Sequence, residues 1–352
     1  MKKLIVSIGF CFGLLFTSSA QLVVIQQKID SLVTAKSITG IIVGTLNKGQ
    51  QQFYTAGWAK VEKQEKFTEN TQLEIGSITK TFTAYILESV LKAQKISDTA
   101  FILPYLPDSV QANKGLAAIR FIHLLNHTAG FPRLPSNMGT PTNLLLPYEG
   151  YTRSKLYSYL VSAKIQPIGS VNYSNLGMGL AGDLAETISD KSYEQLLKKY
   201  ISKSFKLKHT ELRTNTKLPI STGYFNKEQP AIYWNMEGLK GAGGIKSTAT
   251  DMVQYASYIL SHPNDLILQN IISPTTKMNA QISIAKSWHI FSIPNNAPIF
   301  WHNGGTYGFS TFIAINITTQ QAVFLAINEF NKNKIGDNLG ITIITKLLGN
   351  NE

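Results

Sequence analysis

A serine and a lysine stand three residues apart in the stretch EIGSITKTFTA, residues 74–84. Helical periodicity over Ser77–Lys92 predicts a helix, in which residues i and i+3 share one face. Ser77 then lies in the first turn, where free backbone N–H groups and the helix dipole favour negative charge. Lys80 would take the serine proton if burial or nearby cations lower its pKa. The pair alone is a weak signal, because S-x-x-K also occurs at exposed helix positions.

Two later stretches add reactive side chains. VNYSNLG (171–177) carries a phenol and an amide, and FWHNGGTYG (300–308) carries an imidazole, an amide and two glycines. The candidate residues are Tyr173, Asn175, His302, Asn303, Gly304 and Gly305. Structural explanations also exist: Tyr173 could pack, Asn175 could be a helix N-cap, and His302 could satisfy a strand end.

The three motifs together resemble those of the penicillin-recognising serine enzymes: S-x-x-K, then Y-x-N, then K-T-G or its H-x-G variant on a strand edge. Their order fits, and so do the separations of 173 − 77 = 96 and 302 − 173 = 129 residues. LLNHTAGFP (124–132) and GAGGIKSTATDM (241–252) look like structural signatures of the class C β-lactamase-like branch. The resemblance covers nearly all of the chain after its first twenty residues.

This resemblance implies a catalytic role for four side chains. Ser77 would be the nucleophile, Lys80 its proton partner, and Tyr173 the base, as a phenolate or as a relay with Lys80. A free phenol titrates near ~10, so the role of Tyr173 needs the positive field of Lys80 and His302. For substrate binding, Asn175 would bond Lys80 and a substrate amide, and the third motif would add Asn303, Gly304 and Gly305. The N–H groups of Ser77 and Gly305 would form the oxyanion hole.

The third motif departs from the family pattern. True β-lactamases carry an ammonium group and a threonine hydroxyl there, whereas this chain has His302 and Asn303. An imidazole is only partly charged near neutrality, so we expect a weaker, pH-dependent grip on a substrate carboxylate. This favours the peptidases, D-amino-acid-releasing enzymes and esterases of the family over a strong β-lactamase. It also predicts that acylation follows the imidazole titration.

The resemblance and the local patterns predict an α+β fold of the β-lactamase/transpeptidase type. An antiparallel sheet would form from about 21–76 and 285–352, flanked by helices, with a mainly helical region, about 77–284, inserted. The expected elements are a helix at 25–36, a hairpin at 39–59 turning at 47–49, strands at 307–316 and 321–330, and a last helix at 335–348. The proline-punctuated stretch 131–167 reads as a long loop at the functional rim.

The first twenty residues have the pattern of a cleavable signal peptide. Lys2 and Lys3 precede an apolar run, and Ser18-Ser19-Ala20 is a small-residue cleavage site. The apolar run is shorter than the ~20 residues of a spanning helix, so a membrane anchor is the weaker alternative. We therefore expect a secreted or periplasmic protein, with residues 21–352 as one domain. Its only cysteine, Cys11, would be removed with the signal.

Other chemistries fit less well. Without Lys2 and Lys3 the net charge is 12 − 2 = +10, but the positive charges are scattered, which argues against nucleic acid. GMGLAG (177–182) matches a dinucleotide fingerprint but lacks its preceding strand and later acid, so close helix packing explains it better. His123 and His127 have zinc-ligand spacing without the glutamate of a metalloprotease helix, and a structural role fits better.

Two functions remain open. The first is a secreted serine hydrolase that forms an acyl-enzyme with a small-molecule or peptide substrate, such as a peptidoglycan-derived peptide, a small ester or a β-lactam. The second is a catalytically silent module of the same fold that binds cell-wall peptides or a protein. Neither requires a metal or cofactor, and we expect a monomer.

Overall fold

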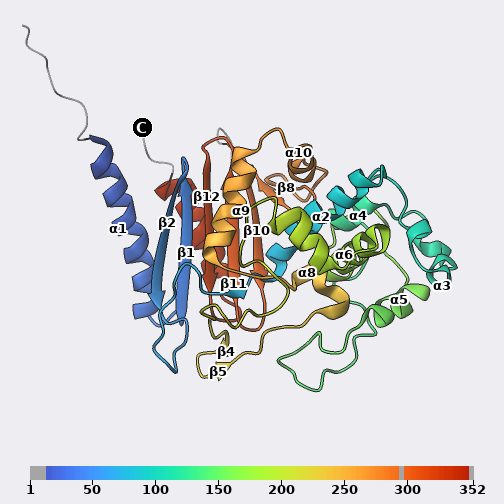
Figure 1. Ribbon diagram of the computed structural model, residues 1–352, viewed down its shortest axis with the longest axis horizontal. Helices are drawn as coiled ribbons and strands as arrows, with labels where there is room; N and C mark the ends of the chain where they lie inside the picture. Colours follow the sequence, from blue (N-terminus) through green and yellow to red (C-terminus); the bar gives the residue numbers. More distant parts are fainter. Residues whose placement is uncertain (1–12, 293–296, 349–352) are drawn as a thin grey trace, which may run out of the picture.

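The computed structural model describes residues 13–292 and 297–348, and its centre is one eight-stranded antiparallel sheet (Figure 1). The strand order is β2-β1-β12-β11-β10-β9-β8-β7. The strands are β1 (Gly40–Asn47), β2 (Gln50–Gly57), β7 (Thr276–Lys277), β8 (Ile282–Ile284), β9 (His289–Phe291), β10 (Ile299–Gly305), β11 (Ser310–Asn316) and β12 (Gln321–Ile327). The prediction of an antiparallel sheet joining the two ends of the chain is therefore confirmed.

Both faces of the sheet are covered by helices. On β1, Ile41 and Val43 point to the face covered by α1 (Gly13–Thr34) and α11 (Asn333–Thr342), while Ile42 points to the opposite face, where α9 (Ala249–Ser261) lies. β11 and β12 alternate in the same way. Because successive side chains enter different cores, all seven residues of β11 and of β12 are buried.

The predicted hairpin is present, and the third motif lies on a strand that the local pattern did not predict. Lys48 and Gly49 both have positive φ in the tight turn between β1 and β2. The expected strand began only at 307, whereas His302–Gly304 are part of β10, in agreement with the strand edge that the resemblance implies. The sheet also extends back to Thr276 in β7, ahead of the predicted boundary at 285.

The mainly helical region contacts one end of the sheet (Figure 1). It contains α2 (Thr79–Ala93), α3 (Asp108–Gln111), α4 (Phe121–Leu125), α5 (Arg153–Val161), α6 (Asn175–Ser189), α7 (Tyr193–Leu196), α8 (Lys240–Gly243) and α10 (Leu266–Ile272). Two short strand pairs lie outside the main sheet. They are β3 (Leu73–Glu74) with β6 (Lys246–Ser247), and β4 (Tyr224–Asn226) with β5 (Gln229–Pro230). The stretch 131–167 is not all loop, because Thr152 caps α5 within it.

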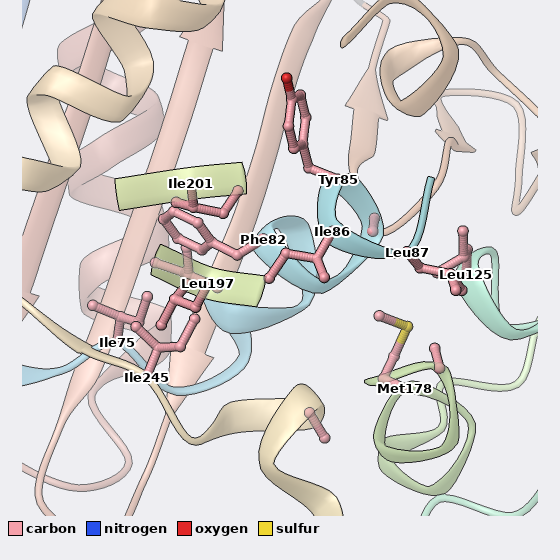
Figure 2. Packing of buried hydrophobic residues seen from close by; sticks show 14 of the residues in the cluster. Ile75, Phe82, Tyr85, Ile86, Leu87, Leu125, Met178, Leu197, Ile201 and Ile245 are labelled. Carbon is pink, nitrogen blue, oxygen red and sulfur yellow. The ribbon is translucent and has the colours of Figure 1, made fainter. Parts of the chain in front are cut away.

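Helix α2 runs through the middle of the molecule. Every residue from Thr79 to Leu91 is buried, so the helix has no solvent face. Figure 2 shows Phe82, Ile86 and Leu87 of α2 pointing in different directions into surrounding apolar side chains. The first turn of this helix carries Lys80, and the 3-10 turn directly before it carries Ser77, so both residues of the first motif adjoin a helix that is held on several sides.

The N-terminal prediction lies partly outside the described residues. Residues 1–12 of the predicted signal peptide are not described, and Gly13–Ala20 form the start of α1. Within 13–292 and 297–348, every helix falls short of the length or apolar character that crossing a membrane requires.

Candidate active site

Ser77 lies in a short 3-10 turn, η1 (Gly76–Ile78), that touches β10. Gly76 has φ of +51°, and a Cβ there would lie 2.7 Å from the Gly305 backbone nitrogen. A Cβ on Gly304 would lie 2.1 Å from the carbonyl oxygen of Ile75. Glycine at both positions lets the serine turn and the strand approach each other, which brings the first and third motifs together.

Lys80 is fully buried and reaches the serine. Its Nζ lies 2.9 Å from the Ser77 Oγ and 2.6 Å from the carbonyl oxygen of Ala242 in α8. Burial, and secondarily the charge of Arg133, hold the pKa of Lys80 well below its ordinary value. A neutral amine hydrogen-bonded to a hydroxyl can accept its proton, as a serine nucleophile requires.

Tyr173 comes directly before α6 and joins the same cluster. Its ring centre lies 4.8 Å from the Lys80 Nζ. Although the residue is partly exposed, burial raises the pKa of Tyr173, and the Ser77 hydroxyl only partly opposes this. The phenol therefore stays protonated in the resting site, and Lys80 is the readier proton acceptor.

His127 fixes the segment that carries Tyr173. Its Nδ1 accepts from the Ser174 backbone N–H at 3.3 Å, and its carbonyl oxygen accepts from the Asn172 N–H at 2.8 Å. The two rings, of His127 and Tyr173, have centres 4.6 Å apart. His127 follows α4 with φ of +62°, so it is not on the helix with His123, and its contacts fit the structural role that the sequence favoured.

His302 is buried beneath this cluster and faces it from β10. Its ring centre lies 6.3 Å from that of Tyr173, and its Nδ1 lies 2.5 Å from the Asn303 carbonyl oxygen. Burial holds the pKa of His302 well below its ordinary value, and His289 and Lys80 add to the shift. The imidazole is therefore neutral at physiological pH. This differs from the predicted partly charged group, so neither a cationic grip by His302 nor an imidazole titration of acylation is expected.

The two asparagines of the motifs also lie differently from the prediction. Asn303 points away from Ser77, and its Nδ2 donates to Asp337 of α11 at 2.8 Å, because alternate residues of a strand face opposite sides. The prediction that the Asn303 side chain binds substrate is therefore not supported. Asn175 donates to the Tyr148 hydroxyl at 3.0 Å rather than bonding Lys80. The helix N-cap is Ser174, whose Oγ accepts from the Gly177 N–H at 2.9 Å.

Sequence reasoning missed Arg133. Its guanidinium carbon lies 5.2 Å from the Tyr173 ring centre, and its charge lowers the pKa of both Lys80 and His127. A cation was expected beside Tyr173, and Arg133 supplies it in place of His302. The position of Arg133 in LLNHTAGFPR, just after a family signature, was the available signal.

The dinucleotide-like GMGLAG stretch lies inside α6 and packs against other elements. A Cβ on Gly179 would lie 2.4 Å from Leu239, and one on Gly182 would lie 3.2 Å from the Cα of Gly241. Close packing of α6 on Leu239 and on Gly241 of α8 therefore explains Gly179 and Gly182, in agreement with the structural role that the sequence favoured. The same approach presents the Ala242 carbonyl to Lys80.

The sequence is similar to beta-lactamases along most of its length. Residues 25–345 match the family described as Beta-lactamase. A beta-lactamase of Yersinia enterocolitica is 26% identical over 284 residues, which are 78% of this chain and 70% of that protein. A beta-lactamase of Pseudomonas fluorescens is 28% identical over 258 residues, covering 72% of this chain and 68% of that protein.

Solved structures show the same fold. A beta-lactamase/D-alanine carboxypeptidase from Pseudomonas syringae superposes with a TM-score of 0.80 at 20% identity, covering 93% of this chain and 99% of that one. A class C beta-lactamase from Rhodobacter sphaeroides gives a TM-score of 0.77 at 20% identity, with the same coverage of both chains.

Proposed function

The chain belongs to the beta-lactamase family of serine hydrolases, and from that premise we propose that it is a secreted or periplasmic enzyme that forms an acyl-enzyme on Ser77. Its substrate is an amide or ester, such as a D-amino-acid-containing cell-wall peptide or a small ester, and β-lactams are poor substrates. The observation that carries the proposal is the 2.9 Å contact between the Ser77 Oγ and a fully buried Lys80.

In acylation, neutral Lys80 takes the Ser77 proton while Oγ attacks the substrate carbonyl carbon. The backbone N–H groups of Ser77 and Gly305 hold the oxyanion, and the closeness of Gly76 to the Gly305 nitrogen supports this role. The proton then passes from Lys80, through Tyr173, to the leaving group as the carbon–leaving-group bond breaks. Tyr173 acts as a relay rather than as a phenolate base, because its raised pKa keeps the phenol protonated, so that it gives up one proton only as it receives another.

In deacylation the same groups act in reverse. Tyr173 and Lys80 together take a proton from the attacking water or acceptor, and the proton returns to Ser77 as the ester bond breaks. Asn175 orients the acyl half of the substrate through its side-chain amide, and Gly304 keeps β10 close to the serine turn. Buried, neutral His302 supports Tyr173 by packing near its ring.

The preference against β-lactams follows from the third motif. His302 carries no charge, since its pKa is held well below its ordinary value, and Asn303 bonds Asp337 on the other face. Neither group supplies the ammonium and hydroxyl that grip a carboxylate in true β-lactamases.

A labelling experiment tests the proposal. We expect a fluorophosphonate to add mass to the wild-type protein and not to Ser77→Ala. A hydrolysis panel of D-Ala-D-Ala peptides, D-amino-acid amides, p-nitrophenyl esters and nitrocefin then ranks the substrates, with nitrocefin slowest. No labelling by a fluorophosphonate or by penicillin would favour the catalytically silent binding module instead.

A further inference from the structure

Arg133 stands beside the proposed active site, and its charge has no ion-pair partner within residues 13–292 and 297–348. Its carbonyl oxygen accepts from the backbone N–H groups of Asn175 and Leu176, at 2.9 and 3.3 Å, which ties its loop to the start of α6. The side chain is exposed, with its guanidinium over the Tyr173 ring. In the part of the chain that the structure describes, Arg133 takes part in no ion pair. Its N–H donors are therefore available to a ligand.

A buried acceptor without a partner lies on the same flank. Asn175 is only 5% exposed, and its Nδ2 donates to the Tyr148 hydroxyl. Within the described residues its Oδ1 is buried and accepts no hydrogen bond. A buried polar atom left in this state costs free energy, which a ligand N–H would recover. This flank thus offers an acceptor and a cation together.

The two flanks of Ser77 differ in charge. On the β10 flank, His302 is neutral and Asn303 is turned away. On the α6 flank, the backbone of Arg133 is tied to the start of α6, and its guanidinium lies over the Tyr173 ring. An arginine held in this way suits a carboxylate, which it binds through paired N–H donors.

We propose that Arg133 selects substrates whose acyl half carries a carboxylate, bound on the α6 flank of Ser77 beside Asn175. The inference rests on the proposed function and adds to it a substrate class and a specificity-determining residue. Substrates with a neutral acyl half are bound less tightly, because they leave the guanidinium without a partner.

Arylboronic acids test this without knowledge of the natural substrate. The Ser77 Oγ forms a bond to boron, Lys80 takes the serine proton, and the aryl group occupies the place of the acyl chain. The probes are phenylboronic acid and its 3- and 4-carboxy derivatives, and tryptophan fluorescence gives the dissociation constants. We expect the tighter-binding of the two carboxy isomers to bind the wild type about tenfold more tightly than phenylboronic acid, because it adds one charge-assisted hydrogen-bonded pair between its carboxylate and the Arg133 guanidinium.

The variants separate the role of this guanidinium from that of net charge. Arg133→Gln should reduce the carboxylate preference to about one, Arg133→Lys should keep part of it, and added NaCl should weaken it in the wild type. Arg120→Gln is the matched control, because Arg120 also lies over an aromatic ring, that of Phe101, at 4.3 Å. It should keep the full preference.

Two failures are distinguishable. If both kinds of probe bind and Arg133→Gln keeps the wild-type preference, the inference is overturned while the proposed function stands. If no boronic acid binds and no fluorophosphonate labels Ser77, the proposed function itself fails, and the inference with it. A urea-unfolding midpoint equal to that of the wild type shows that Arg133→Gln is folded, and because the carboxylate preference is a ratio of two affinities within one variant, a general change in boronic acid affinity cancels.

Discussion

Lys286 and Lys80 are both almost completely buried, yet their surroundings differ. Lys286 is 1% exposed, and its Nζ donates to the Glu88 Oε1 at 2.7 Å and forms a second ion pair with Asp98. Lys80 is 0% exposed, and among the described residues its Nζ forms hydrogen bonds with uncharged groups alone, the Ser77 Oγ and the Ala242 carbonyl oxygen. The residue type and the burial are alike, and the presence of an anion is what differs.

That difference separates a structural lysine from a reactive one. A buried charge is tolerated when an opposite charge compensates its lost hydration, and an amine without such a partner instead gives up its proton. Lys286 joins three segments of the chain through Glu88 of α2 and Asp98 after it. Lys80 joins fewer segments but stands ready to accept a proton, so the missing anion, rather than burial, marks the functional site.

The largest expected effect is on the rate of acylation in Lys80→Met. Removing the proton acceptor should slow fluorophosphonate labelling of Ser77 by about 10²–10⁴-fold. The free energy of unfolding should change by only about 1 kcal/mol, because one neutral hydrogen-bonding group is lost. Mass spectrometry of samples quenched at successive times measures the labelling rate, and urea unfolding measures the free energy of unfolding. Labelling at the wild-type rate would contradict the role of Lys80.

Lys286→Met should show the reverse pattern. It leaves Glu88 buried without its cation, and we expect a loss of about 3–5 kcal/mol in the free energy of unfolding. Labelling of the fraction that remains folded should keep the wild-type rate. The double variant Lys286→Met/Glu88→Gln serves as the control and should recover part of the loss. A stable Lys286→Met single variant would remove the contrast between the two lysines.

Lys246 is an intermediate case, with a carboxyl nearby but no ion pair. It is 4% exposed, and Glu74, at 2% exposed, has its pKa raised to about 7 by burial despite the opposing charge of Lys246. Because the folded-state pKa exceeds the usual carboxyl value of 4.5, the contribution of Glu74 to stability is greatest below pH 4.5 and is lost as pH rises through about 7. Glu74→Gln should lack this loss, which amounts to about 3 kcal/mol at most. Urea unfolding at pH 4.5 and 7.5 checks it, and parallel pH curves for both proteins would refute it.

The smallest effect concerns the charge of Arg133 and the pKa of Lys80. Arg133 helps to lower the pKa of Lys80, after burial, so Arg133→Gln should raise that pKa. Acylation needs the neutral amine, and its rate therefore rises with pH through the pKa of Lys80. In Arg133→Gln this rise should move to higher pH. Labelling should then be about two- to fivefold slower at pH values where the rate is still rising, and unchanged at high pH, where the rate has reached its plateau. A pH–rate profile with a neutral fluorophosphonate measures the shift, and a profile that coincides with the wild type would show that burial alone sets it.

Much of the fold was predictable because its signals are local. The hairpin at 39–59, the helix from Ser77 and the two apolar strands near the C-terminus follow from periodicity and turn residues. Their pairing into one sheet was inferred from the placement of strands at both ends of a helical middle. Strand β10 was missed because polar and glycine residues, His302 to Gly305, interrupt its apolar pattern. Helix α5 was missed because prolines surround it.

For the site, the sequence by itself determined the pairing of Ser77 with Lys80, because side chains three residues apart in a helix lie on the same face. Only the tertiary structure decided the protonation states, because these depend on burial by segments far away in the chain. It buried Lys80 against Ala242 and left His302 neutral. It also turned Asn303 away and brought Arg133 to Tyr173, since the register of a strand and the path of a loop are set by what packs against them.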